Sequence, residues 1–131
     1  MARILVVDDQ PDVARAIARM LSSHETATET DPRSAVARVV GGEQFDMVLV
    51  DFDMPYMTGR NVSDALLDAE LAQPPIVLIM SGSENVGSLF ATGRGVLIKP
   101  LNGKELRDLV SAILHEDEAL SHLHPDPRCA L

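Results

Sequence analysis

Five polar side chains that are suited to phosphoryl chemistry stand at the ends of apolar runs in this chain. The acidic pair Asp8 and Asp9 follows ILVV, and Asp51 follows MVLV. Ser81 follows IVLIM, and Lys99 follows VLI. A run of aliphatic residues bounded by polar residues is typical of a strand that is buried on both faces of a parallel sheet. Because ligands of such sheets bind beyond the carboxyl ends of the strands, we expect these side chains to converge on one crevice.

The three carboxylates of this set require a cation. Crowded together, they repel one another and resist ionising at the same time. Mg²⁺ prefers oxygen ligands and is usually bound by one or two carboxylates together with a phosphate oxygen. The ammonium of Lys99 can neutralise a phosphoryl oxygen, and the hydroxyl of Ser81 can donate to another. The set therefore predicts a Mg²⁺ site that stabilises the charge developed in phosphoryl transfer.

Short apolar runs alternate with helical patterns along the chain. Strands are predicted at 3–8, 26–30, 46–51, 76–80 and 96–98. Helices are predicted around four apolar stripes, namely Val13, Ile17, Met20 and Leu21; Val36, Val39 and Val40; Val62, Leu66, Leu67 and Leu71; and Leu106, Leu109, Val110, Ile113 and Leu114. This alternation predicts a three-layer α/β domain with a (βα)5 flavodoxin-like fold, whose five-stranded parallel sheet has the strand order 2-1-3-4-5.

Capping signals mark the start of several of these helices. Pro11 stands at an early helical position, and Asp31 is suited to cap a helix that has Pro32 at its first position. Asn102 and Glu105 have the spacing of a capping box. The segment between the fourth and fifth strands is rich in glycine, so we expect the fourth helix to be short or irregular.

Length and composition indicate one domain at 1–118 and a flexible tail at 119–131. The single Cys129 has no partner for a disulfide, which favours a reducing compartment. The apolar runs are too short to span a membrane, so a cytoplasmic location is predicted. The net charge is −9 with no basic cluster, which argues against binding of nucleic acid and favours protein partners.

Four motifs in this order give the chain a family resemblance: DD at 8 and 9, DFDMP from 51, MSG with Ser81, and IKP with Lys99. From residue 3 to about 114 the chain resembles the receiver domain of two-component response regulators, and most closely single-domain regulators of the chemotaxis type. The resemblance implies that Asp51 accepts a phosphoryl group from the phosphohistidine of a histidine kinase or of a histidine phosphotransfer protein.

The resemblance also assigns the remaining roles. It implies that Asp9 and Asp51 ligate Mg²⁺ directly, that Asp8 acts mostly through water, and that the main-chain carbonyl of Asp53 is a further ligand. Ser81 and Lys99 are implied to contact the phosphoryl oxygens. Phosphorylation would then shift a two-state equilibrium that controls binding to a downstream protein target, in a monomer or a phosphorylation-dependent dimer.

Two departures from the family pattern concern the output. Val96 stands three residues before Lys99, where the family has Tyr, Phe or His, and the segment from Ser81 to Lys99 is shorter than usual. These departures suggest an alternative, a degenerate receiver that acts as a constitutive binding scaffold. A second alternative is a phosphatase of the haloacid dehalogenase type, because VDFDM resembles its DxD motif. In that family the acidic pair follows the lysine, whereas here it comes first.

Overall fold

Five parallel strands form one sheet in the order β2-β1-β3-β4-β5. The computed structural model describes residues 2–82, 95–98 and 101–123, with side chains up to His115 in the last helix. The strands are β1 (Arg3–Val7), β2 (Glu25–Glu29), β3 (Met47–Asp51), β4 (Ile76–Ser81) and β5 (Gly95–Ile98). The helices are α1 (Pro11–Met20), α2 (Pro32–Val40), α3 (Gly59–Asp68) and α5 (Gly103–Leu123). The predicted flavodoxin-like sheet and its strand order are thereby confirmed.

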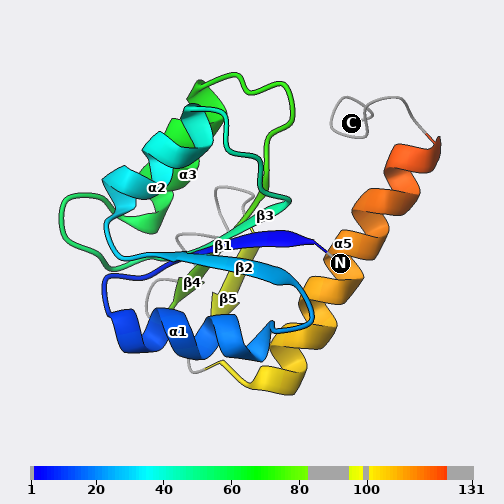
Figure 1. Cartoon of the computed structure of the whole chain (residues 1–131), viewed down its shortest axis with the longest axis horizontal. Coiled ribbons are helices and arrows are strands. Elements are labelled where there is room, and N and C mark those ends of the chain that lie inside the picture. Colours follow the sequence, from blue (N-terminus) through cyan, green and yellow to red (C-terminus); the bar gives the residue numbers. More distant parts are fainter. Residues whose placement is uncertain (1, 83–94, 99–100, 124–131) are drawn as a thin grey trace.

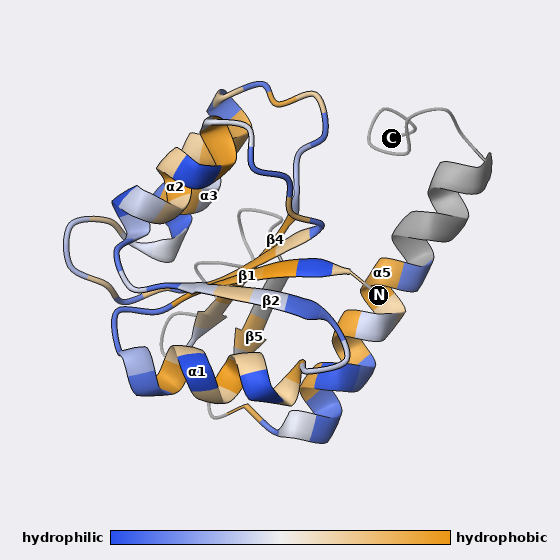
Figure 2. Cartoon of the chain, viewed as in Figure 1, coloured by the Kyte–Doolittle hydropathy of each residue, from blue (hydrophilic) through white to orange (hydrophobic). Residues whose placement is uncertain are grey.

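Both faces of the sheet are buried, because alternate residues of the central strands enter two separate apolar clusters. Ile4 and Val6 of β1 belong to the cluster that includes residues of α1 and α5. Leu5 and Val7 belong to the cluster that includes residues of α2 and α3. Figure 1 shows the same division, with α2 and α3 on one face of the sheet and α1 and α5 on the other. The central strands are accordingly apolar over most of their length, as Figure 2 shows for β1.

The helix starts follow the predicted signals. Helix α1 begins at Pro11. The carboxylate of Asp31 caps α2 by accepting a hydrogen bond of 2.9 Å from the backbone N–H of Arg33. Asn102 caps α5, since its side-chain oxygen accepts a hydrogen bond of 3.2 Å from the backbone N–H of Glu105. These caps satisfy donors that the first turn of a helix leaves without a partner.

Helix α3 differs from the predicted stripe at its carboxyl end. It ends at Asp68, so Leu71 lies in the following loop and not in the helix. Glu70 has φ +51°, a left-handed conformation that does not continue a right-handed helix. Leu67 is 61% exposed, because it lies about 100° around the helix from Leu66, which faces the sheet. The predicted placement of Leu67 and Leu71 on the buried face of this helix was therefore wrong.

The carboxyl-terminal part of the chain is described only as far as Leu123. Helix α5 continues to this residue, beyond the predicted domain boundary at 118. The division into 1–118 and a flexible tail stays a prediction, since residues 124–131 lie outside the described part, as does the region of the predicted fourth helix at 83–94. Among the residues that are described, no helix combines the length and the apolar character needed to cross a bilayer.

Candidate acidic phosphoryl site

The carboxyl ends of β1, β3 and β4 lie next to one another. In the parallel register, Val7 at the end of β1 pairs with Val50 of β3, and Asp51 pairs with Met80 of β4. Asp51 and Ser81 are themselves paired residues, and Asp8 comes directly after the paired Val7, so the sheet itself brings Asp8 and Ser81 to the same edge as Asp51. This edge is where ligands bind in open parallel sheets.

Three carboxylates meet at this edge. One oxygen from each of Asp8, Asp9 and Asp51 lies within 4.8 Å of the other two. Asp8 is 1% exposed and Asp51 is 6% exposed, whereas Asp9 is only partly buried. The predicted convergence of residues from two distant parts of the chain is thus present in the structure.

The donor set at this edge fits a hard divalent cation. All three groups offer carboxylate oxygens, and Mg²⁺ takes oxygen ligands while retaining several waters. Anions held this close and withdrawn from solvent are stabilised when a cation lies between them. The Oδ1 atom of Asp8 accepts a hydrogen bond of 3.0 Å from the backbone N–H of Gln10, which fixes the direction of this carboxylate at the start of α1. Partly buried Asp9 leaves the cluster a side open to solvent and hence to exchangeable ligands.

Ser81 is the last residue of β4 and is 1% exposed. Its hydroxyl donates a hydrogen bond of 3.1 Å to the carbonyl of Gly82. A hydroxyl rotates about its χ1 bond at little cost, so this group can exchange a backbone acceptor for an oxygen brought by a ligand. Lys99 lies outside the described residues, and so does the side chain of Val96.

The loop after β3, residues 52–58, begins at this edge of the sheet and is held at its base. The N–H of Phe52 donates to the carbonyl of Met80 at 2.8 Å, and the N–H of Gly59 donates to the carbonyl of Phe52 at 3.0 Å. Thr58 caps α3, and the side-chain oxygen of Asn61 accepts a hydrogen bond of 3.0 Å from the backbone N–H of Thr58. Asp53 lies within this loop and its side chain is exposed.

Gly59 is a residue of this site that the sequence analysis missed. A Cβ atom at this position would lie 2.8 Å from the carbonyl oxygen of Asp51 and 3.1 Å from the Cα atom of Phe52. Only glycine lets the first turn of α3 approach the backbone of Asp51 this closely. The signal was present in the sequence, because a glycine directly after a capping threonine has no reason to be there for helix propensity alone.

A second group of charges lies away from this edge. Arg38 of α2 donates to both carboxylate oxygens of Glu43, at 3.0 and 2.5 Å, and Arg3 donates to the same carboxylate at 2.8 Å. The hydrogen bond from Arg38, with the charge of Arg3, holds the pKa of the Glu43 carboxyl below its ordinary value. Both guanidinium groups also lie over the ring of Phe45, at 4.6 and 5.4 Å from its centroid. These charges tie the amino ends of β1 and β3 to α2 and stabilise the fold.

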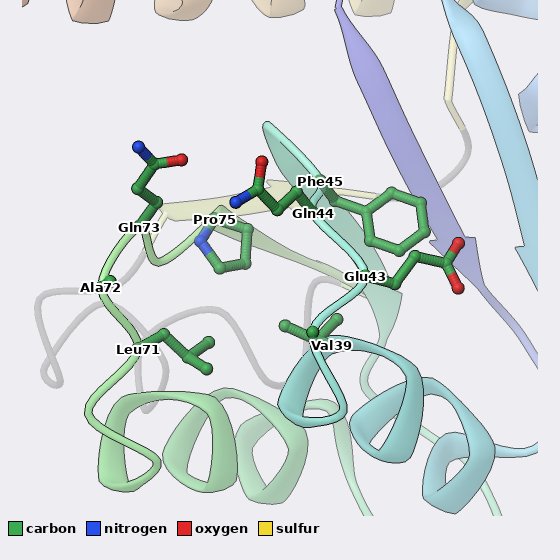
Figure 3. Close-up of a pocket in the computed structure, with 9 residues that line it drawn as sticks. Val39, Glu43, Gln44, Phe45, Leu71, Ala72, Gln73 and Pro75 are labelled. Carbon is green, nitrogen blue, oxygen red and sulfur yellow. The ribbon is translucent and has the colours of Figure 1, made fainter.

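Next to this group is a cavity of about 160 Å³ between the ends of α2 and α3 (Figure 3). Val39 and Leu71 face each other across it, with Phe45 and Pro75 on the side of the sheet. It lies at the amino ends of β3 and β4, whereas the carboxylates lie at the carboxyl ends. The cavity is therefore separate from the acidic site, and it is smaller than the roughly 300–1,000 Å³ that ligand pockets usually have.

Sequence comparison relates the chain to bacterial signalling proteins. It is 34% identical over 108 residues to the transcriptional regulatory protein TcrA of Mycobacterium tuberculosis, a match that covers 79% of this chain and 42% of TcrA. It is 27% identical over 119 residues to the protein PilH of Pseudomonas aeruginosa, which covers 87% of this chain and 98% of PilH. The chain thus spans less than half of TcrA and nearly the whole of PilH.

Solved structures show the same fold. The chemotaxis response regulator CheY4 of Vibrio cholerae superposes with a TM-score of 0.72 at 27% identity, over 86% of this chain and 98% of CheY4. The receiver domain of the Francisella response regulator 1452 has a TM-score of 0.76 at 24% identity, over 88% of this chain and 98% of that domain. The family described as the response regulator receiver domain matches residues 4–111. This chain belongs to the receiver domain family of response regulators in two-component systems.

Proposed function

We propose that this receiver domain accepts a phosphoryl group on Asp51 and that this modification controls its binding to a downstream protein. The observation that carries the proposal is the cluster of carboxylate oxygens from Asp8, Asp9 and Asp51, all within 4.8 Å of one another. Receiver domains take phosphoryl groups from histidine kinases, so the donor is a phosphohistidine of such a kinase or of a histidine phosphotransfer protein. We also propose that the domain acts in the cytoplasm, where such kinases present their phosphohistidine.

The transfer requires one bond to form and one to break. A carboxylate oxygen of Asp51 attacks the phosphorus atom, an acyl phosphate forms, and the bond between phosphorus and the imidazole nitrogen of the donor breaks. The imidazole leaves with its electron pair and is neutral once it holds one proton. Mg²⁺, when bound, neutralises the charge that the phosphoryl oxygens and the carboxylates share.

Each residue of the site has a role in this proposal. Asp9 and Asp51 would hold Mg²⁺ together with the main-chain carbonyl of Asp53, and Asp8 would act mostly through water, as the resemblance implies. Ser81 donates its hydroxyl to a phosphoryl oxygen after releasing the carbonyl of Gly82. Lys99 pairs its ammonium with another phosphoryl oxygen, as the resemblance implies. The arrangement leaves the domain without turnover of an external substrate, because the acceptor is its own side chain.

The family membership bears on the two alternatives. The haloacid dehalogenase reading has no support, since the receiver domain family matches residues 4–111 in the order found here. The scaffold reading predicts the same fold and differs in behaviour only. A scaffold binds its partner equally well in the presence and absence of a phosphoryl mimic, whereas a switch does not.

The test is incubation of the full chain with Mg²⁺ and a small acyl phosphate donor, followed by measurement of the intact mass. We expect the wild type to gain the mass of one phosphoryl group and Asp51→Asn to gain none. Asp53→Asn is the matched control, because it removes an exposed carboxylate two residues away and should still be modified. A wild type that gains no mass under these conditions contradicts the proposal, and modification of Asp51→Asn contradicts the choice of acceptor.

The second part of the test separates a switch from a scaffold. Beryllofluoride with Mg²⁺ imitates the aspartyl phosphate, so self-association and binding to a candidate partner are compared with and without it. We expect a change in one of them. If neither self-association nor partner binding changes, for protein that gained the mass of one phosphoryl group in the first test, the constitutive scaffold is favoured.

A further inference from the structure

The tip of the loop after β3 has an unusual backbone. Tyr56 has φ +73°, and the N–H of Met57 donates to the carbonyl of Pro55 at 2.9 Å, which is the hydrogen bond of a γ-turn. A positive φ is strained for a residue with a bulky side chain, and glycine or asparagine adopts it more easily. Tyr56 is also 74% exposed, so burial in the core does not compensate for the strain.

The compensating contact comes from another segment of the chain. The guanidinium carbon of Arg33 lies 3.8 Å from the centroid of the Tyr56 ring, which is a cation–π contact. Arg33 is itself held in place, because its Nε and Nη2 atoms donate to the two carboxylate oxygens of Asp31 at 3.1 and 2.9 Å. The side-chain hydrogen bond from Arg33 also lowers the pKa of Asp31, which keeps this carboxylate charged. Tyr56 therefore rests on a cation of fixed orientation.

This contact joins the loop to a rigid part of the fold. Asp31 caps α2 and is separated by one residue from β2, whose last residue, Glu29, accepts a hydrogen bond of 3.1 Å from the N–H of Asp8 at its carbonyl. The loop is thus attached at its base through Phe52 and Gly59 and at its tip through Tyr56. The main-chain carbonyl of Asp53 lies between these two attachments.

We infer that Arg33 and Tyr56 form a latch that positions the loop after β3 for Mg²⁺ binding at the acidic cluster. The inference rests on the proposed function, since it concerns the same Mg²⁺ site. Both are positioning residues, because the latch acts through the loop backbone. Loss of the latch leaves the tip free to sample other conformations, and a loop that must be ordered again on binding lowers the apparent affinity. By linkage, Mg²⁺ binding strengthens the stacking of Tyr56 on Arg33 by the same factor.

The test measures Mg²⁺ affinity by isothermal titration calorimetry on the full chain. Arg33→Gln removes the cation, Tyr56→Gly removes the ring, and Tyr56→Phe keeps the ring. We expect the first two variants to bind Mg²⁺ about two- to fivefold more weakly, the range that an exposed cation–π contact supports, and Tyr56→Phe to bind like the wild type. Arg60→Gln is the control, since it removes an exposed arginine just beyond the loop.

The direction of the effect distinguishes the latch from simple electrostatics. Removing a positive charge from the domain strengthens its attraction for a cation, so a pure charge effect makes Arg33→Gln bind Mg²⁺ more tightly, as in Arg60→Gln. Tyr56→Gly separates Mg²⁺ binding from stability, because glycine has two opposing effects on the free energy of unfolding. It relieves the strain of the positive φ in the folded state, and it gives the unfolded chain more conformational freedom. We expect its urea midpoint to change little while its Mg²⁺ affinity falls, a combination that general loss of structure does not produce.

A spectroscopic measurement completes the test. The chain has one tyrosine and no tryptophan, so ultraviolet emission reports on Tyr56 alone. We expect Mg²⁺ to change this emission in the wild type and in Arg60→Gln, and to change it much less in Arg33→Gln. Equal Mg²⁺ affinities in all variants overturn the latch and leave the packing of Met54 and Met57 sufficient to hold the loop. A wild type that binds no Mg²⁺ overturns the latch and the proposed function together. A wild type that binds Mg²⁺ with an affinity that does not depend on Arg33 and Tyr56 overturns the latch alone.

Discussion

Two glycines at equivalent helix positions allow a sharp test of how α3 packs against the end of β3 at Asp51. Gly59 is the first residue of α3 and Gly103 is the first residue of α5. A Cβ atom at Gly59 would lie 2.8 Å from the carbonyl oxygen of Asp51, an atom of the backbone. At Gly103 the nearest atom is the Nη1 atom of Arg107 at 3.2 Å, the far end of a flexible side chain. The same substitution, Gly→Ala, therefore meets a rigid neighbour in one case and a movable neighbour in the other.

The expected magnitudes follow from this difference. Alanine at a compatible position stabilises a protein by about 0.4–1 kcal/mol, mainly because the unfolded chain has less freedom. At Gly103 this gain should appear almost undiminished, at about 0.5 kcal/mol. At Gly59 an overlap with backbone atoms must be relieved by moving α3 or the end of β3, and such overpacking costs about 1–3 kcal/mol. We therefore expect Gly59→Ala to be destabilised by roughly 1–2 kcal/mol.

The assay is urea unfolding of both variants and of the wild type, followed by circular dichroism of the helices. For a domain of this size, each kcal/mol also shifts the thermal midpoint by about 3–5 °C, which gives an independent reading. Because relief of this overlap changes the packing of α3 against the backbone of Asp51, Gly59→Ala should also bind Mg²⁺ more weakly, whereas Gly103→Ala should not. If Gly59→Ala is as stable as Gly103→Ala and binds Mg²⁺ equally well, the close approach of α3 to Asp51 does not constrain the site and the reasoning is refuted.

Three further predictions concern the stability of the domain and are each measured by urea unfolding. Because Arg38 lowers the pKa of Glu43, the charged carboxylate stabilises the fold above the ordinary glutamate pKa, and this stabilisation is lost as the pH falls through the lowered pKa. Glu43→Gln should therefore be less stable than the wild type at pH 7, and the difference in stability should vanish in acid. A difference in stability that is constant with pH would contradict this. Thr58→Ala removes the cap of α3 and should cost about 1 kcal/mol, while Thr58→Ser should cost much less. Gly42→Ala should be destabilised by about 1–2 kcal/mol although the space around it is open, since φ is +112°; a neutral effect would show that the turn can change its conformation.

The strands and their order were predictable because local patterns encode them. An apolar run that is buried on both faces carries its own signal, and Leu5 and Val6 enter different clusters as such a strand requires. The positions of Asp8 and Asp51 at strand ends then follow from the sheet alone. Helix ends were less predictable, since a single left-handed residue, Glu70, ends α3 before the prolines that the sequence presents as its terminator.

The conformation of the loop after β3 could not be predicted from the sequence. Its sequence contains no periodic pattern, so nothing local indicates that Tyr56 has a positive φ or that a guanidinium from α2 lies against its ring. Both facts depend on segments that the crossover connections bring together after the sheet has formed. The proposed site residues were therefore accessible from strand ends, whereas the residues that we infer to position them were not. For the same reason, substitutions at Arg33 and Gly59 are more informative about this domain than further substitutions of the carboxylates, since they test the packing around the acidic cluster on which the proposed function depends.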